Sequence, residues 1–196
     1  MIEPVSRGCV HACTIDDIVR LLELMPGEDS RGFAQCVLRQ PTRKQEILRP
    51  CWGRLLYWAD GEVDRGPTIF LEAQSPSRVL RWETSLDPDE ALELERLRVD
   101  GHSIDQTKRE WVISSTIESI RATQLYRTIP HEMGHYVQFQ RAQEFVKSHA
   151  ERERFAHQYA DKIRKMLINR GRIPFPRQLG KLETGFEGLP KEWFGL

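Results

Sequence analysis

The chain has 196 residues, of which 39% are hydrophobic and 30% are charged, and its 29 basic side chains balance its 29 acidic ones. This length and composition predict a soluble, globular chain with one domain and a core of its own. No run approaches the roughly 18 apolar residues of a membrane helix, so no membrane partner is expected. The first 22 residues lack the basic start and apolar run of a signal peptide, and we therefore expect a cytoplasmic protein.

The four cysteines all lie in the first quarter of the chain, at Cys9, Cys13, Cys36 and Cys51. Without an export signal, free thiols are expected rather than disulfides. The run CVHAC also places His11 between two thiols, which suggests a second metal site. It lacks a second pair of ligands, so we interpret it as an ordinary N-terminal segment.

The first half of the chain predicts one helix followed by a small sheet. In TIDDIVRLLELM, Thr14 is an N-cap, acidic residues fill the first turn and apolar residues recur at helical spacing, which predicts a helix from about Ile15 to Met25. Four short β-type runs bounded by Gly, Pro and Asp follow and predict the sheet: GFAQCVLRQ (32–40), GRLLYWADG (53–61), PTIFLEAQ (67–74) and SRVLRWETS (77–85).

The second half of the chain predicts mostly helix. DPDEALELERLRVDG begins with Asp87 as a cap and Pro88 at the first helical position, and it ends at Gly101. Residues 103–148 keep a helical pattern over more than one helix length, so we expect a break inside them. Pro130 can start or kink the helix that contains it, because proline lacks the amide donor and disfavours α geometry in the preceding residue.

Residues 128–140, TIPHEMGHYVQFQ, contain the pattern H-E-x-x-H. Helical side chains four positions apart lie on one face about 6 Å apart, so His131 and His135 can bind one zinc ion. The carboxylate of Glu132 can take a proton from the metal-bound water. A mid-helix glycine such as Gly134 costs about 1 kcal/mol relative to alanine and usually marks a close backbone approach. The pattern suggests a metal-assisted hydrolase, and its context decides between that and surface histidines on an amphipathic helix.

A catalytic zinc usually has three protein ligands and one open position, so a third ligand is needed. The metzincin pattern H-E-x-x-H-x-x-G-x-x-H is excluded, because Gln138 and Arg141 occupy its last two positions. ERERFAHQYADKI (151–163) predicts a further helix with an apolar stripe. It contains four possible ligands, namely Glu151, Glu153, His157 and Asp161.

HEMGH (131–135) followed by ERFAHQYA (153–160) resembles the zincin-like metallopeptidases of the ImmA/IrrE type. In that family H-E-x-G-H is followed, on the next helix, by E-x-x-A-[ND]-x-[FY]-A. The resemblance covers about 30 residues and implies a zincin fold and a peptidase-like site. It also implies that Glu153 is the third ligand and that Ala156 is the small residue that lets the two helices approach. The sequence departs from the pattern at His157, where the family commonly has Asn or Asp.

We therefore expect residues 1–175 to form a single α+β zincin-like domain, with an N-terminal sheet and helix beside a catalytic helix pair. Residues 176–196, rich in Gly and Pro, are expected to form a tail that docks on the domain through its aromatic residues. A protein or peptide substrate would lie antiparallel along an exposed strand edge, in PTIFLEAQ or SRVLRWETS.

The predicted site residues divide into zinc ligands and catalytic groups. His131, His135 and Glu153 hold Zn²⁺, and Glu132 acts first as general base and then as acid to the leaving amine. His157, one helical turn after Glu153, is the second expected catalytic residue. It is a partner of the zinc ligands, a donor to the transition state, the third ligand in place of Glu153, or an ordinary surface histidine.

Two other functions stay open. The first is a DNA-associated metalloprotease resembling the SprT type, which would use His157 as a third histidine ligand. Residues 141–181, with 11 Lys and Arg against 4 Asp and Glu, would then bind the DNA. Such a run is usually a solvated helix face, so nucleic acid is a possible but not an expected partner. The second open function is a non-catalytic binding module, in which zinc only joins two helices.

Overall fold

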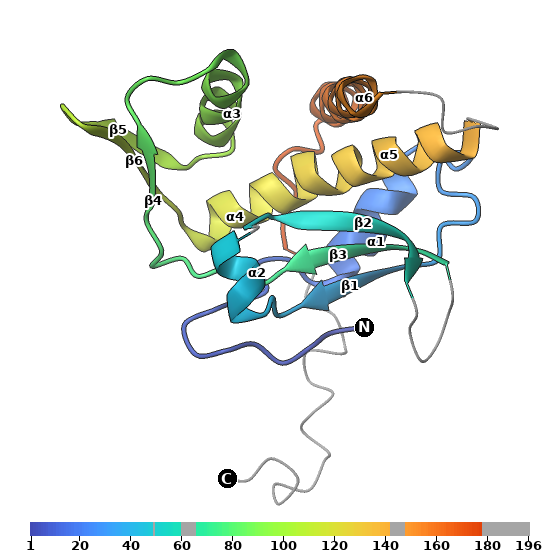
Figure 1. The fold of residues 1–196 in the computed structure, drawn as a ribbon. Coiled ribbons are helices and arrows are strands. Elements are labelled where there is room, and N and C mark those ends of the chain that lie inside the picture. Colours follow the sequence, from blue (N-terminus) through green and yellow to red (C-terminus); the bar gives the residue numbers. More distant parts are fainter. Residues whose placement is uncertain (49, 60–65, 142–147, 178–196) are drawn as a thin grey trace, which may run out of the picture.

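The computed structural model describes residues 1–48, 50–59, 66–141 and 148–177 and shows two three-stranded sheets and helices (Figure 1). The predicted α+β class is confirmed. No helix in these residues is long and apolar enough to cross a membrane. All four cysteines have free thiols, as predicted. The prediction that residues 176–196 dock as a tail falls almost entirely outside the described residues.

The first sheet contains β1 (Gln35–Arg39), β2 (Gly53–Ala59) and β3 (Gly66–Glu72), with α2 (Arg43–Leu48) between the first two strands. The strand order is β1-β3-β2, with β1 parallel and β2 antiparallel to β3. The run PTIFLEAQ thus forms the central strand, which is paired on both sides. The prediction that it offers an exposed edge is wrong, and β2 is the edge strand beside the helix that contains the histidines.

The second sheet was not predicted as a separate unit. It contains β4 (Leu80–Glu83), β5 (Ser103–Gln106) and β6 (Glu110–Ser114) in the order β4-β6-β5, all antiparallel. The helical prediction for residues 103–114 is wrong. The hydroxyl of Thr107 accepts hydrogen bonds from two backbone amides of the β5–β6 turn. Ile104 of β5 and Trp111 and Ile113 of β6 then join the apolar cluster formed with α3, so tertiary packing decides the conformation.

Two helices begin and end where their caps predict. α1 (Ile15–Leu24) starts after Thr14, which forms a capping box with the third helical residue. α3 (Pro88–Val99) starts after Asp87, which forms the same kind of box. It ends before Gly101, whose φ of 91° lies in the left-handed region that glycine favours.

A single helical run crosses the middle of the fold. It consists of α4 (Ile117–Thr123), the π-helical turn η1 (Gln124–Thr128) and α5 (Ile129–Arg141). The wide turn comes directly before Pro130. Proline has no amide to donate, and its ring would clash with the carbonyl four residues earlier in a regular α-helix. The predicted break is therefore a local widening of the helix rather than its end.

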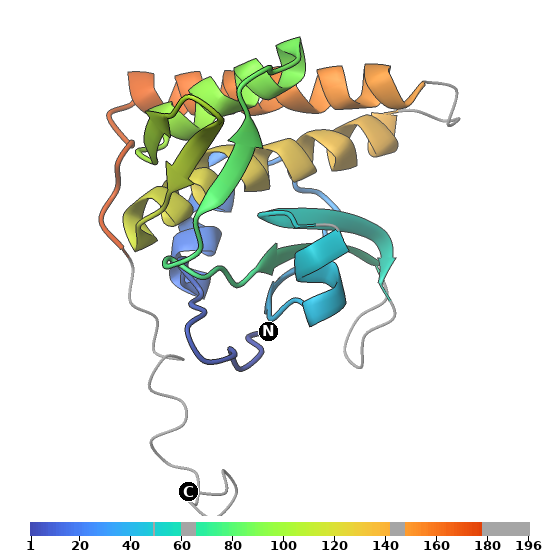
Figure 2. The ribbon, with the colours of Figure 1, turned by 60° about the vertical axis from the view of Figure 1, so that its left-hand side comes forward.

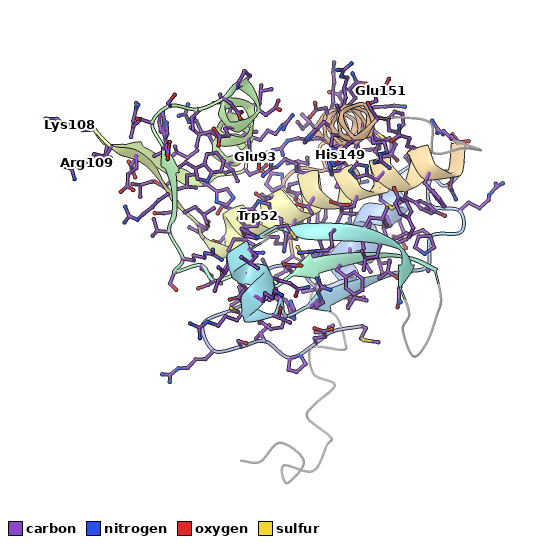
Figure 3. All side chains as sticks on the ribbon, viewed as in Figure 1. Trp52, Glu93, Lys108, Arg109, His149 and Glu151 are labelled. Carbon is purple, nitrogen blue, oxygen red and sulfur yellow. The ribbon has the colours of Figure 1, made fainter. Side chains whose placement is uncertain are left out.

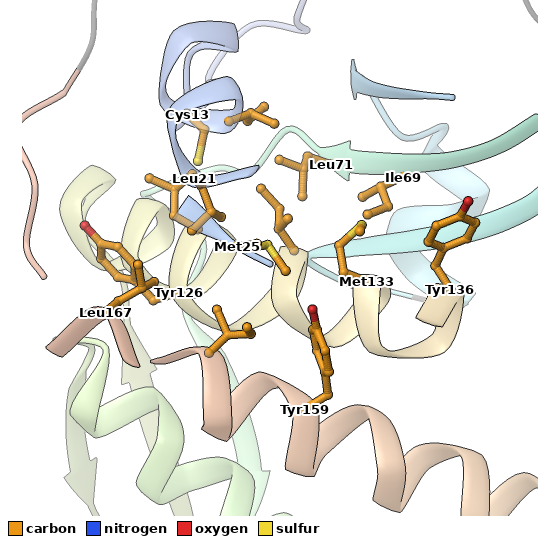
Figure 4. Packing of buried hydrophobic residues seen from close by; sticks show 14 of the residues in the cluster. Cys13, Leu21, Met25, Ile69, Leu71, Tyr126, Met133, Tyr136, Tyr159 and Leu167 are labelled. Atoms are coloured by element: carbon orange, nitrogen blue, oxygen red, sulfur yellow. The ribbon is translucent and has the colours of Figure 1, made fainter. Parts of the chain in front are cut away.

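The last helix, α6 (His149–Asn169), packs against α5 and crosses it, as Figure 1 shows, where α6 is seen nearly end-on and α5 runs across the view; Figure 2 shows the pair from another side. A Cβ added to Gly134 would lie 2.9 Å from the Cα of Ala156, so the two helices touch through backbone at this point. The prediction of a close approach at these two residues is confirmed. The main core lies between this helix pair, α1 and the first sheet, and includes Leu21, Ile69, Met133 and Tyr159 (Figure 4).

Gly134→Ala is expected to destabilise the fold. At an ordinary helical position this change stabilises by about 1 kcal/mol. Here the new methyl group meets the Ala156 backbone of α6, which cannot rotate away, and it must push the helices apart. We expect the free energy of unfolding, measured by urea denaturation, to fall by about 1–3 kcal/mol. Gly27→Ala is the control, because nothing lies within 4 Å of a Cβ there. A Gly134→Ala protein as stable as the parent would contradict the close packing.

Candidate metal centre

Three predicted ligands meet between α5 and α6. The Nε2 atoms of His131 and His135 are 3.1 Å apart. Glu153 faces both rings, with Oε2 3.4 Å from Nε2 of His131 and Oε1 3.3 Å from Nε2 of His135. Within the described part of the chain, this is the one group of three or more His, Cys, Asp and Glu side chains whose ligand atoms converge within 4.8 Å. The CVHAC segment forms no such group.

These distances suit a tetrahedral zinc ion. With zinc–ligand bonds of about 2.0–2.1 Å, neighbouring ligand atoms are separated by about 3.3–3.4 Å. The observed separations are near that value: 3.1 Å between the two ring nitrogens, and 3.4 and 3.3 Å from each nitrogen to its nearest carboxylate oxygen, which is a different oxygen for each histidine. The two histidine side chains are 15% and 14% exposed and the glutamate is 37% exposed, so water reaches one side of the cluster. The donor set of two imidazoles and one carboxylate therefore fits a zinc ion with an open position.

The fold explains why Glu153, and not Glu151, joins the histidines. Glu151 is the third residue of α6, and its carboxylate accepts a hydrogen bond from the amide of Ser148 at 2.9 Å. It is thus part of the capping box at the start of the helix. Glu153 lies two positions further along and faces α5, where Gly134 and Ala156 allow the helices to come together.

Electrostatics keep the ligand groups in the forms that bind metal. A hydrogen bond from His131, with further help from the charges of nearby histidines, lowers the pKa of Glu153 to about 2. Burial, together with the charge of His131, lowers the pKa of His135 to about 4. At neutral pH Glu153 is therefore a carboxylate and His135 a neutral imidazole, which are the protonation states that metal binding requires.

Glu132 lies next to the cluster but outside it. Its Oε2 accepts a hydrogen bond from the backbone amide of Leu55 in β2, at 2.8 Å. Burial raises the pKa of Glu132 to about 7, against the opposing effects of His131 and of the Leu55 amide. A carboxyl group that titrates near neutral pH is suited to take up and release a proton in general acid–base catalysis.

His157 lies beside His131, with ring centroids 4.5 Å apart and ring planes inclined by 55°. Burial and the charge of His131 lower the pKa of His157 to about 4. Its ring nitrogens are not part of the converging group, which is completed by Glu153. The structure therefore places His157 next to the predicted metal ligands without making it one of them.

Three further groups at the site were missed at the level of sequence. Besides the Leu55 amide, the hydroxyl of Tyr57 in β2 donates to the carbonyl of His135 at 3.4 Å. His149, labelled in Figure 3, places Nε2 3.7 Å from Oε1 of Glu153 and is 81% exposed. Of these groups, only His149 could have been found from the sequence, since it precedes Glu153 by four positions on the same helix. Nothing in the motif points to β2.

A cavity of about 400 Å³ adjoins the cluster. It lies between the start of β2, the helical run of α4 to α5, and the unit formed by β4 and α3. Trp52 and Glu93, labelled in Figure 3, are part of its lining. Three site residues also line it, namely His131, Glu132 and His157. Its volume lies within the range of about 300–1,000 Å³ typical of ligand sites.

Comparison of the chain with protein-family models, with curated protein sequences and with solved structures finds no match.

Glu153→Gln is expected to weaken zinc retention, because an uncharged amide is a much poorer zinc ligand than a carboxylate. Glu151→Gln is the matched control: it removes the same charge from the same helix, and glutamine also completes a capping box. Zinc content after dialysis against a weak chelator separates the two variants. Loss of zinc from Glu151→Gln but not from Glu153→Gln would show that the third ligand is assigned incorrectly.

Proposed function

We propose that the protein is a zinc-dependent metallopeptidase with a zincin-like arrangement. The observation that carries this proposal is the convergence of His131, His135 and Glu153 at zinc-ligand spacing, with Glu132 directly beside them. Water reaches the cluster from one side, as a hydrolytic site requires. The edge strand β2 beside the motif helix further supports the zincin-like interpretation.

Glu132 would act as the proton carrier of the reaction. When bound, zinc would supply a Lewis acid that polarises the peptide carbonyl and makes water more acidic. Glu132 takes the proton of the attacking water, and its raised pKa matches this task. It then gives the proton to the leaving amine. The Leu55 amide holds one carboxylate oxygen, which leaves the other to carry the proton.

Strand β2 would align the substrate. Leu55 donates to Glu132, so its amide points away from β3. Residues of an antiparallel strand alternate between the partner strand and the free edge, so Gly53 shares this orientation, whereas the pairing with β3 becomes irregular after Leu56. An extended peptide can add to such an edge through main-chain hydrogen bonds. This assignment replaces PTIFLEAQ, which is central, and is preferred over β4, which belongs to the other sheet.

The proposal is tested with a mixture of unstructured peptides. Zinc-loaded protein is expected to cleave some of them, a strong chelator is expected to stop cleavage, and added zinc is expected to restore it. Fragments are identified by mass spectrometry. Cleavage that continues after the metal has been removed would contradict the proposal, and so would a zinc-loaded protein that cleaves nothing.

The position of His149 favours one alternative, in which zinc only joins the helices. Its Nε2 is 3.7 Å from Oε1 of Glu153, so it is the nearest candidate for a fourth protein ligand. A site closed by four protein ligands is structural, whereas a catalytic site keeps a solvent position. In the described structure His149 does not join the converging group, and the open site is therefore preferred.

The SprT-like alternative has less support. It needs His157 as third ligand, whereas Glu153 completes the cluster. Of the basic residues in α6, Arg164 pairs with Asp100 at 2.6 Å rather than facing a partner. Salt-dependent DNA binding, together with loss of zinc in His157→Ala, would favour this alternative.

A further inference from the structure

We infer that the cavity beside the metal centre binds a carboxylate of the substrate, on the C-terminal side of the cleaved bond, and that Arg78 is the residue that holds it. The carboxylate is either the free C-terminus of the peptide or the side chain of an Asp or Glu residue. This inference rests on the proposed peptidase function and names the substrate class that the site takes.

Arg78 is an exposed arginine that lines the cavity, and within the described part of the chain it has no carboxylate partner. Its side chain donates a hydrogen bond from Nη2 to the backbone carbonyl of Glu46, at 3.3 Å. The carboxylate of Glu46 instead accepts a hydrogen bond from Gln40. A guanidinium carries five N–H donors in a planar fork that matches a carboxylate. Most donors of Arg78 are therefore available to a ligand in the cavity.

The other charged groups around the cavity leave positive charge in excess. Glu93, labelled in Figure 3, and Arg127 both line it, and each carboxylate oxygen of Glu93 lies 2.5 Å from Nη1 of Arg127. Arg96 is a second partner of Glu93, at 3.7 Å. Asp100 is shared by Arg127, at 3.0 Å, and Arg164, at 2.6 Å. Three arginines thus surround two carboxylates, before the exposed arginine described above is counted.

Arg127 contributes to this excess through its charge rather than by direct contact. Its Nη2 atom is buried and has no hydrogen-bond partner in the described structure. Glu132 is the remaining carboxyl group on the wall; with it ionised, four arginines face three carboxylates, so one positive charge stays in excess. Trp52 and Trp82 form apolar parts of the wall, and apolar surroundings strengthen interactions between charges. The cavity therefore favours an anionic group over a cationic one.

The direction of the substrate follows from the way β2 lies on the helical run. A Cβ added to Gly53 would be 2.9 Å from Cγ2 of Thr128, and the hydroxyl of Tyr57 donates to the carbonyl of His135. Strand and helix therefore run in the same direction, and the cavity lies at the Gly53 end. A peptide antiparallel to β2 reaches that end with its C-terminal half. The carboxylate that meets Arg78 thus follows the cleaved bond.

The first measurement compares forms of one peptide that the zinc-loaded protein cleaves. These are the free acid, the C-terminal amide, and amides with Glu or, as a neutral match, Gln at each position after the cleaved bond. We expect the free acid or one Glu peptide to be cleaved at least about fivefold faster than its neutral match, the upper end of what an exposed ion pair contributes. The faster form identifies the source of the carboxylate. Equal rates for all forms would overturn the inference and leave the peptidase function standing.

Arg78→Glu is expected to reverse this preference, so that Lys in place of Glu gives the better substrate. Because Arg78 is exposed, zinc content and circular dichroism should match those of the parent. Arg43→Glu is the control, because it makes the same charge change at an exposed arginine outside the cavity lining. A preference for Glu that survives Arg78→Glu, or that Arg43→Glu reverses equally, would overturn the inference.

A binding measurement separates the inference from the peptidase function. Titration calorimetry uses zinc-loaded Glu132→Gln protein with the same peptides, or with an alanine-rich pentapeptide as free acid and as amide if the parent cleaves none. We expect a carboxylate form to bind at least about fivefold more tightly than the neutral form, and Arg78→Glu to abolish the difference. This result in a protein that cleaves nothing would overturn the peptidase function but uphold the carboxylate site. Equal binding of both forms would overturn the carboxylate site.

Discussion

Glu132→Gln is expected to keep its zinc and its fold but to lose peptide hydrolysis. The amide has the same shape as the carboxylate, and the three ligands are untouched, so only proton transfer is removed. General acid–base catalysis contributes about 10²- to 10⁴-fold, and we expect the rate to fall by at least that factor. Because glutamine can still accept a hydrogen bond through its carbonyl oxygen, the contact with the Leu55 amide can persist.

The measurements are zinc content, circular dichroism and the initial rate of cleavage at saturating zinc. Glu151→Gln is again the control, since it removes a charge that lies in the cap of α6. If Glu132→Gln cleaves as fast as the parent, Glu132 is not the base. If it loses its zinc, Glu132 is a ligand or a structural residue, and the peptidase mechanism fails.

His135→Ala is expected to lose stoichiometric zinc at neutral pH. Only His131 and Glu153 would then remain of the converging ligands, and two protein ligands retain zinc poorly. His149→Ala is the matched control, because this exposed histidine lies next to Glu153 without joining the group. Full zinc occupancy in His135→Ala, or loss of zinc in His149→Ala, would contradict the ligand set. Metal content after gel filtration is sufficient to decide.

Local signals in the sequence predict the helices well. Thr14 and Asp87 begin α1 and α3 through capping boxes, and both depend on residues within three positions of the cap. The second sheet was missed for the opposite reason. In residues 103–114, β5 pairs with β6, β6 pairs with β4 on the far side of α3 in the sequence, and apolar side chains of both strands pack on α3, so the strand conformation depends on contacts outside this segment. The central place of β3 likewise depends on pairing with two separate strands.

In the candidate site, too, the features set by local sequence were predicted, and those that depend on distant parts of the chain were not. The spacing of His131 and His135 follows from the helical repeat, and Gly134 with Ala156 predicts the contact that brings Glu153 close. The amide that holds Glu132 comes from a strand 77 positions earlier. No sequence motif predicts this contact or the cavity, because backbone groups and apolar walls produce no characteristic residue spacing.

The zinc coordination sphere tests the central claim most directly. X-ray absorption spectroscopy of the zinc-loaded protein is expected to show one zinc per chain with two imidazole nitrogens, one carboxylate and at least one solvent oxygen, and no sulfur. The same spectrum should be unchanged in His149→Ala. A fourth protein ligand in place of solvent would identify a structural zinc site and contradict a catalytic one. A chain that binds no stoichiometric zinc would contradict the metal centre itself.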